Sequence, residues 1–155
     1  MNFGILLSIL CLVFCGQVHA ADRPVVDINC QSHGMGPLLN CSVLIKQKDG
    51  AAISNAQVML SALMPSMPMA HTIKPVKAQP GTSPGRYEAT LTLEMLGVWS
   101  VDVDISGPVR DKVSKNMMVV ECPESGRCPV KVATAAEIEA EKRQYGQKRM
   151  HGAKH

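Results

Sequence analysis

The sequence predicts an all-β protein, an antiparallel β-sandwich followed by a short C-terminal helix and a disordered basic tail. Apolar and polar side chains alternate along several short runs, as they do in strands that bury one face. Turn-forming Gly, Pro and Asp-Gly sequences separate these runs at short intervals. About seven such strands over roughly 100 residues are typical of an immunoglobulin-like sandwich.

The N-terminal segment, residues 1–20, contains no Asp, Glu, Lys or Arg. Its apolar run from Gly4 to Cys15 is shorter than the roughly 20 residues that span a bilayer. It fits a secretory signal peptide cleaved after Ala20, although the lack of Lys or Arg before the run leaves an uncleaved membrane anchor open. Lipoprotein attachment through Cys15 is disfavoured, because the bulky Phe14 precedes it. We expect a periplasmic or secreted protein without a stable membrane anchor after cleavage.

Six runs of the remaining chain carry the alternation. In 86–94 the apolar side chains at odd positions face one way, and the polar side chains at even positions face the other. The run 98–105 repeats this pattern from Trp99 onward, and a link of hairpin length, 95–97, joins the two. The predicted strands are 25–30, 40–47, 56–63, 86–94, 98–105 and 112–122.

Four cysteines remain after signal cleavage: Cys30, Cys41, Cys122 and Cys128. An even number in an exported chain predicts two disulfides, with three possible connectivities. Local pairing, Cys30–Cys41 and Cys122–Cys128, is the one we expect. A zinc site would need closer ligand pairs such as C-x2-C, which the sequence lacks.

The chain changes character after Cys128 and becomes rich in alanine and charge. Thr134 and Glu137 match a capping box, and Gly146 is a plausible helix end. We therefore divide the chain into a signal peptide (1–20), a sandwich domain (21–130) and a helix with a flexible basic tail (131–155). Most of the formal net charge of +3 lies in the last fifteen residues, and this mild excess does not indicate nucleic-acid binding.

The segment MPSMPMAH, residues 64–71, is the strongest candidate for chemistry. Pro65 and Pro68 should end the preceding strand, and extended backbone would place Met67, Met69 and His71 on one side, with Met64 joining from the turn. Thioethers are soft ligands that suit Cu(I), and imidazole suits copper in either oxidation state. The segment predicts a copper site.

A structural interpretation stays open beside this one. The mature chain has only three aromatic residues, and methionine fills irregular core gaps well. Met67 and Met69 would then fold over the end of the sandwich against Trp99. Two further sets are weaker candidates for metal ligands: His33 and Met35 in the turn between the first two cysteines, and the tail residues Met150, His151 and His155.

Catalytic signatures are missing from the sequence. No G-x-S-x-G elbow, P-loop or dinucleotide-binding fingerprint occurs, and the acidic residues of the strands fall mainly on outward positions. We do not expect an enzyme.

The central stretch, from Asp49 to Ile105, resembles the YtkA-like domain family. DGAAISNAQVMLSALMPSMPMAH and GRYEATLTLEMLGVWSVDVDI carry the resemblance, although Ala51 and Ala52 follow Gly50 where the family usually has proline. The resemblance implies an immunoglobulin-like sandwich in the bacterial envelope. Members are mostly uncharacterised, and some are attached to metal-efflux adaptors. The related FixH-like proteins serve assembly of a copper-containing cytochrome oxidase and keep a membrane anchor. The matching positions are Gly50, Ala56, Val58, Met64, Pro65, Met67, Met69, Gly85, Tyr87, Ala89, Met95, Gly97 and Trp99.

Two functions from different classes follow. The first is an exported copper carrier or sequestering protein that uses Met64, Met67, Met69 and His71, with His33 and Met35 as additional ligands. The second is a non-metal envelope module whose sheet edge or sandwich end docks a partner in an efflux or oxidase-assembly system, since methionine-rich surfaces adapt to partners.

Overall fold

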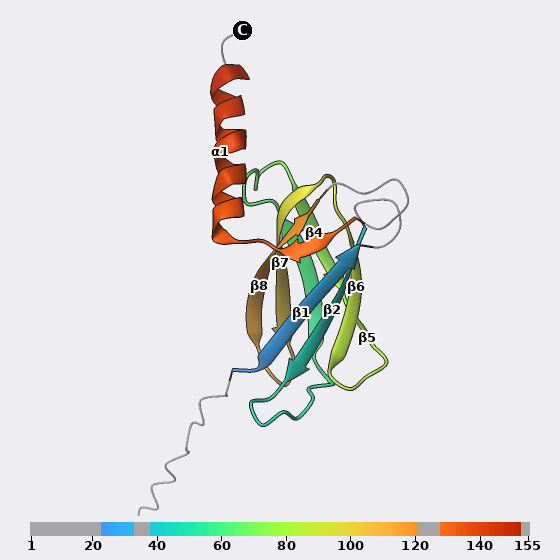
Figure 1. Ribbon diagram of the computed structural model, residues 1–155. Helices are drawn as coiled ribbons and strands as arrows, with labels where there is room; N and C mark the ends of the chain where they lie inside the picture. The colour runs from blue at the N-terminus through green and yellow to red at the C-terminus, as the bar shows by residue number, and fades with distance from the viewer. Residues whose placement is uncertain (1–22, 33–37, 121–127, 153–155) are drawn as a thin grey trace, which may run out of the picture.

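Two antiparallel sheets pack face to face, and one helix stands at the end of the sandwich (Figure 1). The computed structural model describes residues 23–32, 38–120 and 128–152, with side chains as far as Tyr145. The elements are β1 (Val25–Ser32), β2 (Leu38–Lys46), β3 (Gln57–Leu63), β4 (Thr72–Lys77), β5 (Gln79–Pro80), β6 (Arg86–Thr92), β7 (Gly97–Ser106), β8 (Asp111–Val119), β9 (Val130–Val132) and α1 (Ala135–Gly152).

The strand order is that of an immunoglobulin-like sandwich. One sheet has the order β1-β2-β6-β5 and the other β4-β3-β7-β8-β9. If the strands β1 to β8 are lettered A, B, C, C′, D, E, F and G, an ABED sheet packs against a C′CFG sheet, and β9 extends the second sheet beyond G. This is the immunoglobulin arrangement. The predicted all-β sandwich is confirmed.

Period-two alternation located the long strands well. In β7, Trp99, Val101 and Val103 have no exposed surface, and the residues between them are half-buried. In β6, Tyr87 and Leu91 are buried while Glu88 and Thr90 are exposed. These inward residues of the two sheets meet in one core, so hydrophobic burial is the main force that holds the layers together.

The sandwich has features that the sequence did not predict. β4, β5 and β9 have no counterpart among the predicted runs. The hairpin expected at 95–97 is wrong, because β6 pairs with β2 and β5 whereas β7 pairs with β3 and β8. The link therefore carries the chain from one sheet to the other, and it places Glu94 at the end of the sandwich.

Cys30 and Cys41 are directly opposite each other in the β1–β2 pair and form a disulfide, as predicted. Cys128 is buried and also disulfide-bonded. Its expected partner, Cys122, lies outside the described residues, so that pairing stays a prediction.

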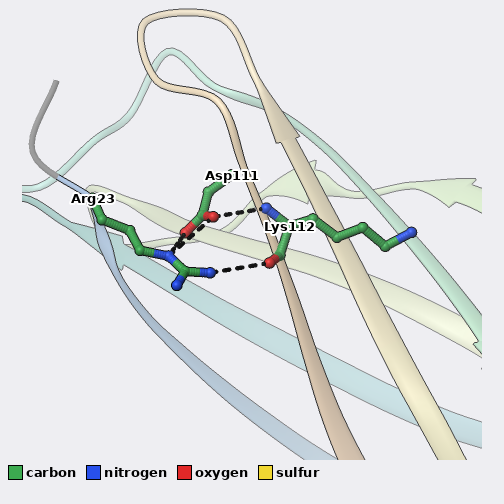
Figure 2. A network of polar contacts seen from close by, with 3 residues as sticks. All are labelled: Arg23, Asp111 and Lys112. Atoms are coloured by element: carbon green, nitrogen blue, oxygen red, sulfur yellow. Dashed lines mark hydrogen bonds and ion pairs between the residues drawn. The ribbon is translucent and has the colours of Figure 1, made fainter. Parts of the chain in front are cut away.

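The start of β1 is tied to the start of β8 at the end of the sandwich farthest from α1. Arg23 Nε donates to both carboxylate oxygens of Asp111, at 3.2 and 2.9 Å, and Arg23 Nη2 donates to the carbonyl of Lys112 (Figure 2). The hydrogen bond from Arg23 holds the pKa of Asp111 below its ordinary value. These hydrogen bonds hold Arg23, which lies just before β1, against the first two residues of β8.

The C-terminal helix begins as predicted and runs farther than predicted. The backbone amide of Thr134 donates to Glu137 Oε2 at 2.9 Å, and the amide of Glu137 donates to Thr134 Oγ1 at 3.3 Å, so the capping box is formed. The helix continues past Gly146 to Gly152, and the stop predicted at Gly146 is wrong. In the described part of the chain, no helix combines the length and hydropathy needed to cross a bilayer.

Candidate metal centre

The segment 64–71 connects β3 to β4 as a closed loop of two consecutive β-turns. Met67 N donates to Met64 O at 2.9 Å, and Ala70 N donates to Met67 O at 3.1 Å. Each turn has proline at its second position, where a fixed φ near −65° favours the turn. Met64 N donates to His71 O at 3.0 Å and closes the loop. The proline-terminated strand is confirmed, but the extended backbone expected after it is wrong.

The three methionines of the loop lie in three different environments. Met64 is completely buried among core residues, Met67 is half-buried and packs against the core, and Met69 is 93% exposed. Core packing therefore accounts for Met64, and we do not retain it as a ligand. Met67 and Met69 keep thioethers near the surface of the loop.

His71 is brought next to Met67 by the second turn. The amide of His71 donates to Met67 O at 3.1 Å, so the two side chains start from adjacent backbone. The ring of His71 is partly exposed and lies edge-on to Trp99, with 6.5 Å between ring centroids. Imidazole and thioether thus share one edge of the sandwich.

Glu94 is a residue of this site that the sequence pattern placed only among the outward polar side chains of the run 86–94. Its Oε2 lies 2.5 Å from Nδ1 of His71. Within the described part of the chain, Nε2 has no hydrogen-bond partner, which makes it the nitrogen available to a metal. Carboxylates that hold one nitrogen of a metal-binding imidazole in this way orient the ring and raise its basicity. No signal in the sequence links these residues, because Glu94 and His71 meet only through tertiary structure.

Glu141 of α1 is a second carboxylate at the same end. Its Oε1 accepts a hydrogen bond from Ser66 Oγ at 3.0 Å, and its Oε2 accepts one from the amide of Val98 at 2.7 Å. Two acidic side chains, from different elements, therefore border the loop and favour the approach of a cation.

The other predicted ligands are not brought to this loop by the described structure. His33, Met35 and His155 lie outside the described residues. Met150 and His151 belong to α1, nine and ten residues beyond Glu141. At 1.5 Å per residue their backbone lies roughly 14 Å farther along the helix axis. The role of the tail residues as metal ligands stays a prediction.

The described residues contain no group of three or more His, Cys, Asp or Glu side chains arranged for a metal ion. Methionine sulfur is not among those ligand types, so a thioether site is a separate question. A surface groove of about 700 Å³ is lined largely by polar side chains of β1, β2 and β6, such as Asn29, Asn40 and Glu88, and by Val76 and Lys77 of β4. None of the residues 64–71 lines this groove.

Comparison with known proteins identifies the central part of the sandwich. No curated protein and no solved structure shows significant similarity to the chain. Residues 40–104 match the YtkA-like family model. The match runs from β2 into β7 and includes the 64–71 loop and Glu94, whereas Glu141 lies outside it. The β-sandwich of this protein therefore contains a YtkA-like domain.

Proposed function

We propose that the protein is an exported copper carrier or sequestering protein that holds Cu(I) at the 64–71 loop through Met67, Met69 and His71. The observation that supports this most is the 2.5 Å contact between Glu94 and His71, because His71 lies in a loop that also carries the thioethers of Met67 and Met69. A carboxylate-oriented imidazole is the usual arrangement of a metal-binding histidine.

The ligand chemistry favours Cu(I) over hard cations. Thioether sulfur is soft and neutral, and imidazole binds copper readily. Thioethers do not titrate, so protons compete with the metal only through the imidazole, and affinity should fall modestly in mild acid. The nearby carboxylate of Glu94 balances the charge of the bound ion.

The exposure of the loop suits transfer rather than permanent storage. Met69 is almost fully exposed, and methionine has three rotatable side-chain bonds, so its sulfur can reach either the ion or an incoming partner. An exposed ligand permits handover by ligand exchange, as a carrier requires.

Titration of residues 21–155 with Cu(I) against a competing chelator tests the proposal. We expect one ion per chain. The double substitution M67L/M69L should weaken binding by about 100-fold or more, since mutating a residue that only orients a metal ligand already costs about 10–100-fold in metal affinity. Met59→Leu is the matched control, because Met59 is a half-buried methionine of β3 outside the loop. Equal affinity of M67L/M69L and Met59→Leu would show that copper, if bound, is not bound at this loop.

The exposed Met69 also favours the second candidate, an envelope interaction module, because exposed methionine adapts to a partner surface. The two functions are separated by purifying the exported protein from copper-supplemented cells and measuring bound metal. A metal-free protein that retains a discrete envelope partner, and loses it in Met69→Ala, would favour the interaction module.

A further inference from the structure

We propose that α1 is a latch whose docking on the sandwich is weakened when metal occupies the 64–71 loop. This inference rests on the copper function proposed above. It starts from how little apolar contact holds the helix. Among the side chains described in α1, only Glu137, Ile138, Glu141 and Tyr145 are half-buried, and the others are exposed. A helix with so thin an apolar face depends on specific polar contacts for its position.

Glu141 supplies those contacts to two separate segments. Its carboxylate accepts from Ser66 Oγ in the first turn of the loop and from the amide of Val98 at the start of β7. The pairing of β3 with β7 ends at Leu63↔Ser100, so within residues 23–32, 38–120 and 128–152 no strand pairs with Val98 on that side. The Glu141 carboxylate therefore accepts the hydrogen bond from the Val98 amide that a neighbouring strand would otherwise accept. Hydrogen bonds to a charged acceptor are among the stronger ones.

We expect the first turn of the loop to shift when the loop binds an ion. Met69 is exposed and its side chain can rotate toward the ion, but Met67 packs partly against the core. For Met67 to bind the ion beside His71, we expect it to give up part of its core contact and to move the first proline turn with it. Ser66 lies between Pro65 and Met67, inside the first turn, and its bond to Glu141 shifts with it.

Linkage then sets the sign of the coupling. The loop conformation that binds the ion has lost the Ser66–Glu141 hydrogen bond. The docked helix keeps this bond and therefore favours the loop conformation seen here. Such coupling is reciprocal: bound metal weakens docking, and loss of docking strengthens metal binding by the same factor. Release of α1 would signal that the carrier is loaded.

The test uses residues 21–155 and the diamagnetic ion Cu(I), so that amide exchange can be followed by NMR. Glu141→Ala removes both bonds, whereas the control Glu139→Ala alters an exposed side chain of the same helix whose recorded contact is with Lys142. In the metal-free protein we expect faster exchange of the Val98 amide in Glu141→Ala and no change in Glu139→Ala. Adding Cu(I) to the wild type should likewise speed Val98 exchange, and Glu141→Ala should bind Cu(I) about fivefold or more tightly than Glu139→Ala.

The outcomes separate the latch from the copper site. If the wild type binds Cu(I) and neither Val98 exchange nor the affinity of Glu141→Ala changes, the latch is refuted and the copper function stands. If the wild type binds no Cu(I), the copper function and the coupling both fail, whatever the metal-free exchange shows. If Glu141→Ala binds Cu(I) more weakly than Glu139→Ala, the coupling has the opposite sign and the proposal is overturned.

Discussion

A Cβ atom at Gly97 would lie 3.0 Å from Cε of Met64, the fully buried first residue of the 64–71 loop. The same atom would lie 3.0 Å from Glu141 Oε1, and Gly97 has a φ of +128°, which other residues rarely adopt. The absence of a side chain at Gly97 thus lets a core methionine and the carboxylate of α1 approach the start of β7 together.

Gly97→Ala should therefore destabilise the fold and loosen α1. Backbone strain and the two close approaches together predict a loss of about 2 kcal/mol or more in the free energy of unfolding. Gly50→Ala is the matched control, because Gly50 has a φ of +91° but nothing within 4 Å of its Cβ position. Urea denaturation of both variants measures the difference, and equal losses would show that only the backbone conformation matters at Gly97.

Met64 and Met69 should differ sharply in their effect on stability. Met64→Ala leaves a cavity in the core and should cost about 2–5 kcal/mol, whereas Met69→Ala at a solvated turn should stay within about 0.5 kcal/mol of the wild type. Thermal unfolding followed by circular dichroism measures both. Met64→Leu conserves volume and should keep both the fold and the affinity for Cu(I), because Met64 is not among the ligands that we propose. A large loss of affinity in Met64→Leu would return Met64 to the ligand set.

The strands could be predicted from the sequence where buried and exposed side chains alternate regularly. Burial of one face imposes a period of two, and this period located β6 and β7 and the inward direction of Trp99. β4 could not be found in this way: it is an edge strand with one partner, most of its residues are exposed, and Pro75 interrupts it. β4 shows no regular alternation because Ile73 is its only residue that is not exposed, and it is the one that packs against the core.

The candidate site could be predicted only in part, for a similar reason. The loop residues Met67, Met69 and His71 are adjacent in sequence, so their type and spacing were visible. Glu94 and Glu141 reach the loop from 23 and 75 residues away, measured to His71 and Ser66 respectively. No local pattern marks such partners, and an exposed glutamate on a strand or helix has the same sequence signature whether or not it contacts a functional loop.

Tyr87 carries a buried hydrogen-bond pair that should be measurable in stability. Its hydroxyl donates to the carbonyl of Ile53 at 2.9 Å and accepts from the amide of Ala56 at 2.9 Å. Tyr87→Phe leaves both backbone groups without this partner in the core, so we expect a loss of about 1–3 kcal/mol. Thr90→Val, which removes an exposed hydrogen bond to Asn40, is the control and should cost far less. Similar unfolding midpoints for the two variants would contradict the structural role of the Tyr87 hydroxyl.

The N-terminus of α1 should lose stability in acid. Hydrogen bonds, first from Lys131 and then from Thr134, lower the pKa of Glu137 from 4.5 to about 2. A carboxyl whose pKa is lower in the folded state stabilises that state fully above its unfolded pKa and loses this contribution as the pH falls through the folded value. Helicity followed by circular dichroism should therefore fall between about pH 4.5 and 2, and Glu137→Gln should flatten this part of the profile. Glu139→Gln should leave the profile in place, and an identical acid profile in Glu137→Gln would refute the assignment.

The Cys30–Cys41 disulfide should stabilise the sandwich mainly through the unfolded chain. The two residues are separated by 11 positions, and closing a loop of that size removes conformational entropy worth about 3 kcal/mol. The double substitution C30A/C41A should lower the free energy of unfolding by about this amount, because the strands remain paired while the unfolded chain gains freedom. Equilibrium urea unfolding under non-reducing conditions measures the loss. Reducing the wild type is a weaker test, because Cys128 is disulfide-bonded too, and an unchanged midpoint in C30A/C41A would show that β1–β2 pairing is secured by other contacts.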